Sequence, residues 1–197
     1  MPALETARLC VRPLRAEDLN VVHRILDVEL ADADFGSEGA SSFAQREEWL
    51  QWTIRNYLQL ARLYQPPYGD RAIALKSSDE VIGVCGFVPS FGPFSQLPGF
   101  DDATEPGAAR LYRPELGLFY AVSVHAQRRG YAAEAARAMA DYAFQHLRLQ
   151  RLVATTTYDN AASIRVMQKL GMQILRNPHP EPPWFQVVGV LANRAVR

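Results

Sequence analysis

The sequence lacks the features that mark several large classes of protein. It contains no window approaching the roughly 20 apolar residues that span a bilayer, and its N-terminus has no apolar core of signal-peptide length. Its 21 basic and 21 acidic residues cancel, so no net charge draws the chain to nucleic acid or to an anionic membrane surface. We therefore expect a cytoplasmic protein that binds neither nucleic acid nor membrane.

Cysteine and histidine are scarce and show no metal-ligand spacing. Cys10 and Cys85 are far apart, and each lies in an apolar, strand-like run. The histidines are equally scattered, at His23, His125, His146 and His179. We therefore predict two buried, reduced thiols and no bound metal.

The hydrophobic content, 48% of 197 residues, is enough to bury a core. We predict a single domain over residues 1–197 that contains one long loop at about 89–114, where proline and glycine are frequent. A connection of that length is uncommon inside a compact domain, and it is usually a functional lid or a disordered segment. Both interpretations stay open.

The hydrophobic periodicity predicts an α/β layout in the order βααβββαβαββ, with mixed strand pairing. Strands are expected at 8–14, at 72–88 as a hairpin, and at 115–124, 151–158, 172–177 and 184–192. Helices are expected at 15–30, 43–64, after Gly130, and at 160–171, where Gly171 is a natural left-handed cap. The aromatic residues of the second helix region are expected to pack in the core: Trp49, Trp52, Tyr57 and Tyr64.

The segment "QRRGYA", Gln127 to Ala132, joins a strand to a helix. The first N–H groups of a helix lack intrahelical partners and carry partial positive charge, so an anion fits there. Gly130 lets the backbone turn and lets a phosphate oxygen approach the neighbouring amides, while Arg128 and Arg129 add charge. The spacing matches neither a Walker loop nor a dinucleotide fingerprint. We predict a pyrophosphate site, and a tight turn with exposed arginines is the alternative.

This junction and the segment "NAASIRVMQKLGM", about thirty residues later, together resemble the GNAT superfamily of N-acetyltransferases. Gln127, Gly130 and Ala132 match its pyrophosphate motif Q/R-x-x-G-x-G/A. The next family motif is matched by Asn160, Lys169, Leu170, Gly171 and Met172. The forms "GYAAEA" and "N-x-x-S" resemble the branch of the ribosomal-protein N-terminal (alanine) acetyltransferases. The resemblance covers roughly residues 5–191 in element order, and it is specific over about 115–175.

The resemblance implies a mixed, mostly antiparallel central sheet, flanked by helices and splayed between its fourth and fifth strands. It also implies acetyl-CoA as co-substrate, with the pantetheine arm paired to main chain at Val122, Ser123 and Val124. An amide near Val122 would polarise the thioester carbonyl. The other residues implied to bind the co-substrate are Gln127, Arg128, Arg129, Gly130, Tyr131, Ala132, Asn160 and Ser163. Glu134 would repel an anion if it faced inward, so we expect it to point away from the site.

The acceptor amine must lose a proton before it attacks. An N-terminal amine with a pKa near 8 is roughly a tenth neutral at pH 7, whereas a lysine is neutral only about once in a few thousand. Glu115 is the first candidate for the base, because family members often place a carboxylate on this strand, and Asp159 and His125 are alternatives.

The leaving thiolate needs a proton donor. Many family members use a tyrosine seven residues after the helix-starting asparagine, but this chain has Met167 there. Ser163 and Tyr158 are the candidate replacements.

The sequence therefore predicts an acyltransferase that moves acetyl from acetyl-CoA to a primary amine, by direct attack in a ternary complex. A protein or peptide N-terminus is the leading acceptor. A polyamine, amino acid or aminoglycoside is an alternative that the acidic stretches at 31–39 and 100–105 would suit. A catalytically silent acyl-CoA-binding module is a third possibility, and Met167 in place of the usual tyrosine favours it. Trp184 and Phe185 are candidates for the acceptor pocket or for a subunit interface, so a homodimer stays open.

Overall fold

The computed structural model describes residues 1–33, 39–100 and 111–193. The chain divides into two compact units. Unit 1 is Met1–Val88 with Phe119–Tyr142, and unit 2 is Pro89–Leu118 with Ala143–Arg197. The prediction of a single domain stays a prediction. Most of the two acidic stretches, and the middle of the loop predicted at 89–114, lie outside the described residues.

Unit 1 consists of an antiparallel run of strands with helices beside it. The strands are β1 (Leu4–Glu5), β2 (Leu9–Pro13), β3 (Gly69–Leu75), most of β4 (Val81–Gly92) and the end of β5 (Arg113–Val122). The helical segments are η1 (Ala16–Asp18), α1 (Leu19–His23), the π-helical turn η2 (Arg24–Glu29), α2 (Phe43–Arg62) and most of α3 (Tyr131–Gln145). Strands β1 to β4 pair antiparallel in chain order.

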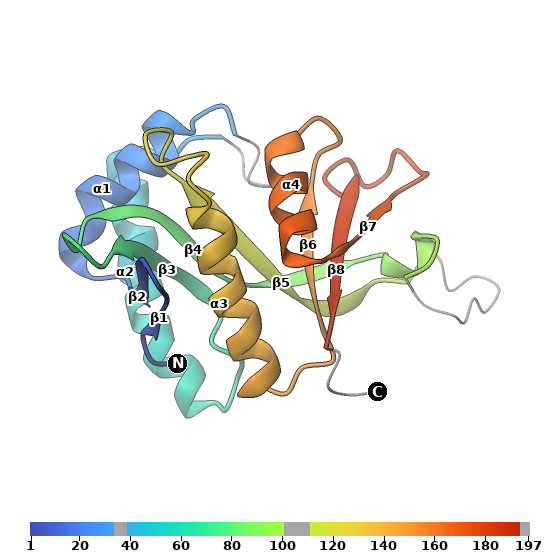
Figure 1. The fold of residues 1–197 in the computed structure, drawn as a ribbon, viewed down its shortest axis with the longest axis horizontal. Coiled ribbons are helices and arrows are strands. Elements are labelled where there is room, and N and C mark those ends of the chain that lie inside the picture. The colour runs from blue at the N-terminus through green and yellow to red at the C-terminus, as the bar shows by residue number, and fades with distance from the viewer. Residues whose placement is uncertain (34–38, 101–110, 194–197) are drawn as a thin grey trace. The chain divides into compact units, whose positions relative to one another are not determined.

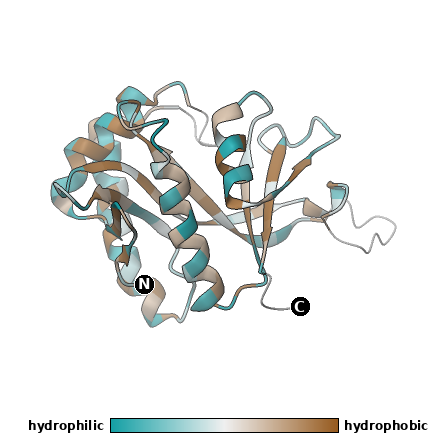
Figure 2. Cartoon of the chain, viewed as in Figure 1, coloured by the Kyte–Doolittle hydropathy of each residue, from teal (hydrophilic) through white to brown (hydrophobic). Residues whose placement is uncertain are grey.

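The core of unit 1 lies between its sheet and its first helices. Figure 1 shows the strands of this unit running between α2 and α3. The buried cluster joins α1, η2 and α2 to β3 and β4 through Leu14, Val22, Ile25, Leu26, Leu50, Ala72, Ala74, Val81, Val84 and Ala121. The strands are largely hydrophobic, whereas hydrophobic and hydrophilic residues alternate along the helices (Figure 2). This is expected when each helix buries one face. No helix in the described ranges is both long and apolar enough to cross a membrane.

Unit 2 contains the end of β4, η3 (Phe94–Gln96), the first part of β5 and the C-terminal elements. The C-terminal elements are β6 (Arg151–Thr156), α4 (Ala161–Leu170), β7 (Gln173–Arg176) and β8 (Val187–Ala192). Strand β8 pairs antiparallel with both β6 and β7, and α4 packs against all three strands. The buried cluster of this unit is Phe94, Leu97, Phe100, Val153, Leu175, Phe185 and Val188.

The predicted fold class is confirmed. In the described part of the chain the hydrogen-bonded strand order is β1-β2-β3-β4-β5-β6-β8-β7, a mixed and mostly antiparallel sheet. Strands β5 and β6, the fourth and fifth of the predicted order, pair in parallel at Gly117 and Val153, in agreement with the predicted splay.

Helix boundaries follow local capping rules. The side chain of Ser42 accepts a hydrogen bond from the Gln45 N–H at 3.3 Å, and the Gln45 side chain accepts one from the Ser42 N–H, which makes a capping box at the start of α2. At α4 the side chain of Asn160 accepts from the Ser163 N–H at 3.0 Å. Gly171 ends that helix with φ of +81°, as predicted from its position in the sequence.

Several predicted boundaries and burials differ from the structure. Strand β1 was not predicted, because two residues carry no periodic signal, and β4 continues to Gly92 inside the segment predicted as loop. Strand β8 begins at Val187, after the proline-rich turn. The packing prediction was wrong for Trp52 and Tyr64, which are 59% and 96% exposed. Trp52 lies on the outward face of α2, and Tyr64 lies beyond the end of that helix, in the left-handed region with φ of +55°. Both cysteines are free, but only Cys85 is fully buried.

A buried carboxyl group makes the stability of unit 1 depend on pH. Asp70 lies on β3, and its Oδ1 is buried and accepts no hydrogen bond from the described residues. Burial raises the pKa of Asp70 to about 7, against a smaller opposing effect from Arg46. The folded carboxyl therefore keeps its proton up to about pH 7, while the unfolded carboxyl loses it near 3.8. Stability must fall as the pH rises through this window.

We expect Asp70→Asn to remove this loss of stability at rising pH. The group lowers the wild-type free energy of unfolding by on the order of 2 to 4 kcal/mol as the pH rises from about 4 to about 7, and the variant should lack that decline. Urea unfolding across this range measures it. Asp141→Asn, which changes an exposed carboxylate on α3, is the control. Identical pH slopes for Asp70→Asn and wild type would contradict the assignment.

Candidate functional site

Two left-handed residues shape the loop between β5 and α3. Arg128 and Gly130 both lie in the left-handed region, with φ of +64° and +83°. A Cβ at Gly130 would find only the Arg8 guanidinium near it, at 3.5 Å, so the space beside the glycine is open. Left-handed residues that alternate with right-handed ones turn successive amides toward one anion. Tyr131 then begins the 15-residue helix α3, whose first N–H groups lie beside the loop.

Gln127 closes this loop on the strand that precedes it. Its side-chain amide donates to the carbonyl oxygen of Val122 at 3.1 Å. The Ala126 N–H donates to the Ser123 carbonyl at 2.8 Å within the same turn. Arg128 and Arg129 are exposed, as an anion-binding role requires. The first residue of the motif therefore shapes the loop, and the two arginines are its accessible charges.

Arg8, which the sequence analysis did not single out, ties the loop to β2. Its Nη1 donates to the Arg129 carbonyl oxygen at 3.0 Å, and its guanidinium lies 4.5 Å from the centre of the Tyr131 ring. The Nε of Arg8 also donates to Glu134 at 2.7 Å. No local motif marks this residue, because its partners are more than 120 positions away.

Glu134 is compensated rather than aimed at the loop. One carboxylate oxygen accepts from the Thr6 hydroxyl at 2.6 Å and from the Arg8 N–H at 2.9 Å, and the other binds the Arg8 guanidinium. Burial opposes ionisation of this carboxyl, but the hydrogen bonds from Thr6 and Arg8 outweigh it and lower its pKa. Glu134 is therefore held by Thr6 and Arg8, and the expectation that it points away from the co-substrate stays a prediction.

A second residue that the sequence analysis missed, Glu29, holds the end of β5. One of its oxygens, Oε2, accepts a hydrogen bond from the Ser123 hydroxyl and another from the Val124 N–H at 3.1 Å. The Ser123 N–H donates to Ile82 at 2.9 Å. The amides of Ser123 and Val124 are thus already engaged in unit 1. The predicted main-chain contacts to pantetheine at Val122, Ser123 and Val124 stay predictions.

Glu115, the first candidate for the base, is paired within unit 2. Both carboxylate oxygens lie within 3.1 Å of Arg151 Nε, and a second guanidinium nitrogen also donates to Oε1. The Arg151 guanidinium stacks 4.2 Å from the centre of the Phe100 ring. An ion pair of this geometry engages the lone pairs that a base needs. Asp159 and His125, the alternatives, are exposed.

The candidate acids lie at the start of α4 and just before it. The Tyr158 hydroxyl donates to the carbonyl oxygen of Asn177. Ser163 is in the first turn of α4, where its N–H is capped by Asn160. Met167 is fully buried, and its sulfur would lie 2.9 Å from a Cβ at Gly189, so this side chain fills the core where many family members have tyrosine.

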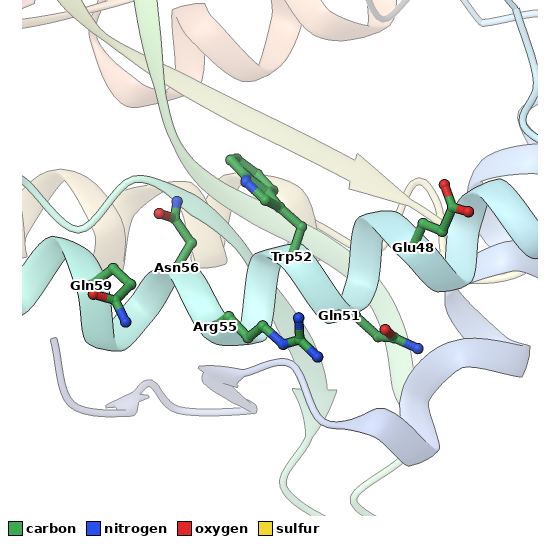
Figure 3. A pocket seen from close by; sticks show the side chains of 6 residues that line it. All are labelled: Glu48, Gln51, Trp52, Arg55, Asn56 and Gln59. Atoms are coloured by element: carbon green, nitrogen blue, oxygen red, sulfur yellow. The ribbon is translucent and has the colours of Figure 1, made fainter.

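A shallow hollow of about 310 Å³ on α2 contains none of the predicted site residues. Its lining comes from one helix: Glu48, Gln51, Trp52, Arg55, Asn56 and Gln59 (Figure 3). Ligand sites usually enclose most of the ligand's surface, and this hollow is shallow and lined by one helix face, so it does not have the form of a catalytic site.

Comparison with known proteins assigns the family. A family model described as an acetyltransferase (GNAT) domain matches residues 8–173. The chain is similar to the uncharacterized N-acetyltransferase YoaA of Bacillus subtilis, with 28% identity over 173 residues, which are 87% of this chain and 83% of that protein. It is also similar in structure to the ribosomal-protein-S5-alanine acetyltransferase of Vibrio fischeri, with a TM-score of 0.67, 15% identity and 100% of both chains covered. A further similar structure is RimL, a ribosomal L7/L12 alpha-N-protein acetyltransferase in complex with coenzyme A, with a TM-score of 0.61, 16% identity and 95% of each chain covered.

The family model covers most of the chain, so the chain belongs to the GNAT acetyltransferase family. It is an N-acetyltransferase that depends on acetyl-CoA. The predicted family, enzyme class and fold class are therefore confirmed. The two solved structures, at 15% and 16% identity, share its fold.

Arg8→Met should destabilise unit 1, because it removes the guanidinium that binds Glu134 and the Arg129 carbonyl while keeping most of the apolar stem. The Arg8 side chain is 47% exposed, so we expect a loss of about 1 kcal/mol in the free energy of unfolding. Urea denaturation measures this loss, with Arg55→Met on the exposed face of α2 as control. Equal effects of the two substitutions would refute the anchoring role of Arg8.

Proposed function

We propose that the chain transfers the acetyl group of acetyl-CoA to the α-amine of a protein or peptide N-terminus, by direct attack in a ternary complex. The observation that carries the co-substrate assignment is the left-handed loop at Arg128 and Gly130, directly before α3. The acceptor assignment is supported by fold similarity to enzymes described as acting on ribosomal proteins. The pairing of Glu115 described above supports it independently.

The loop residues fit the pyrophosphate of acetyl-CoA. Arg128 and Arg129 are exposed and supply positive charge, and the amides from Arg128 to Ala132 are the donors for phosphate oxygens. The acidic residue in the first turn of α3 is already neutralised by Arg8, so it does not repel an anion. The open space beside Gly130 admits the close approach of a phosphate oxygen.

The state of the candidate base favours an N-terminal amine. Glu115, the first candidate for the base, is engaged by Arg151 and is poorly placed to take a proton from the acceptor. A lysine depends on such assistance far more than an α-amine does, because a much smaller fraction of lysine is neutral at pH 7. Catalysis with a weak base is therefore consistent with an α-amine acceptor.

Ser163 is carried over from the N-x-x-S motif as the proposed proton donor to the leaving sulfur. The Tyr158 hydroxyl, the other candidate, donates its proton to a main-chain carbonyl in unit 2. Ser163 and Asn160 are carried over from the family motif as contacts to the pantetheine arm, and both roles are part of the proposal. Bound acetyl-CoA supplies the acyl thioester, and the amide near Val122 is proposed to polarise its carbonyl.

Gly130→Glu should abolish binding of acetyl-CoA. The substitution places a side chain in the left-handed region, fills the space that the pyrophosphate needs, and adds negative charge beside it. Isothermal titration of acetyl-CoA should show micromolar affinity for the wild type and a loss of at least about a hundredfold in the variant. Glu80→Gln, at an exposed turn, is the control. Tight binding by Gly130→Glu would show that the phosphates lie elsewhere.

The acceptor class is tested with a matched pair of peptides. One peptide has a free α-amine and no lysine. The other has an acetylated N-terminus and differs in sequence only by one internal residue replaced by lysine. Thiol release from acetyl-CoA at pH 7 should be about a hundredfold faster with the first peptide, and its rate should rise with pH up to about 8. Faster turnover of the lysine peptide, or of spermidine, would contradict an N-terminal acceptor.

A further inference from the structure

Glu29 reaches the end of β5 from a separate helical segment. It is the last residue of the π-helical turn η2, in which the Leu30 N–H donates to the Ile25 carbonyl at 3.1 Å. A π-turn is uncommon in helices and is found frequently at functional sites. The side chain of Glu29 is only 8% exposed, so its charge is committed to local partners.

These partners are consecutive residues of the main chain that follows β5. Glu29 Oε2 accepts from the Ser123 hydroxyl and the Val124 N–H, and the Ser123 oxygen in turn accepts from the His125 N–H at 3.3 Å. Ser123 is 4% exposed, so water does not readily replace the carboxylate as its acceptor. Hydrogen bonds to an ionised acceptor are about twice as strong as neutral ones. One carboxylate therefore fixes the direction of the chain just after Val122.

The same geometry argues against Glu29 as the general base. Its Oε2 already accepts two donors. Its Oε1 is buried and lies 3.1 Å from Arg24 Nε, in an ion pair that is not aligned as a hydrogen bond. Neither oxygen is accessible to an acceptor amine, so Glu29 acts through the residues it holds.

We propose that Glu29 is a positioning residue that fixes Val122 to Val124 for the acyl-pantetheine end of acetyl-CoA. This inference rests on the proposed function. The nucleotide end of acetyl-CoA is proposed to bind the loop between β5 and α3, which is held by other residues, Gln127 and Arg8. Loss of Glu29 should therefore weaken contacts to the acyl-pantetheine arm and leave contacts to the nucleotide and pyrophosphate intact.

Two probes separate the ends of the co-substrate. Acetyl-CoA contains both ends, and adenosine 3′-phosphate 5′-diphosphate contains the nucleotide and pyrophosphate without the pantetheine arm. In isothermal titration, Glu29→Ala should weaken the affinity for acetyl-CoA by about tenfold or more. It should change the affinity for the nucleotide probe by less than about twofold. Glu29→Gln keeps an acceptor oxygen for Ser123 and should recover most of the lost affinity. Glu47→Ala, an exposed glutamate on α2, is the control.

The outcomes distinguish this inference from the function on which it rests. If the wild type binds neither probe, the proposed co-substrate site is wrong and the role of Glu29 fails with it. If the wild type binds both probes, but Glu29→Ala either retains full affinity for acetyl-CoA or loses both probes equally, the positioning role is wrong and the site stands. Selective loss of acetyl-CoA affinity, restored by Glu29→Gln, is the result that supports the inference.

Discussion

The loop between β5 and α3 has the shape it has because side chains from elsewhere in unit 1 hold it. Glu29 binds the chain as it leaves the strand, Gln127 closes the turn, and Arg8 ties the loop to β2. Arg128 adopts a left-handed conformation that costs a non-glycine residue about 1 to 2 kcal/mol, so these contacts must offset a strain that the loop alone would relieve. Because these three side chains hold the loop in place, Arg128 and Arg129 can stay exposed.

The helical segment that carries Glu29 is itself fixed by a buried charge. Asp27, two residues earlier, binds the Arg46 guanidinium through two bonds of 2.7 Å and accepts the Ser41 N–H at 2.8 Å. Breaking such a buried pair from one side costs about 3 to 5 kcal/mol, because a charge is left without its partner. The segment therefore cannot easily shift along its axis. Because Asp27 is bound to Arg46 of α2, the nearby Glu29 can hold the end of β5 in a fixed position.

Local rules made part of this site predictable from sequence. Gly130 and Gly171 are needed where the backbone turns left-handed, and Asn160 is a favoured cap, so each was identified from its immediate neighbours. Arg8 and Glu29 were missed because their partners lie 121 and 94 positions away, beyond any local pattern. The pairing of Glu115 was hidden for the same reason, since Arg151 follows 36 residues later. Periodicity likewise predicted helix α2 but not which of its aromatic residues face solvent.

The co-substrate site that we propose depends on the amides beside Gly130 binding the pyrophosphate of acetyl-CoA. The most direct test is to follow the backbone amide signals of the isotope-labelled chain by NMR while coenzyme A is added. We expect the largest shifts to fall on Arg128 to Ala132, with a second group at Val122 to Val124. Shifts confined to other segments, such as the hollow on α2, or no shifts at saturating coenzyme A, would contradict it.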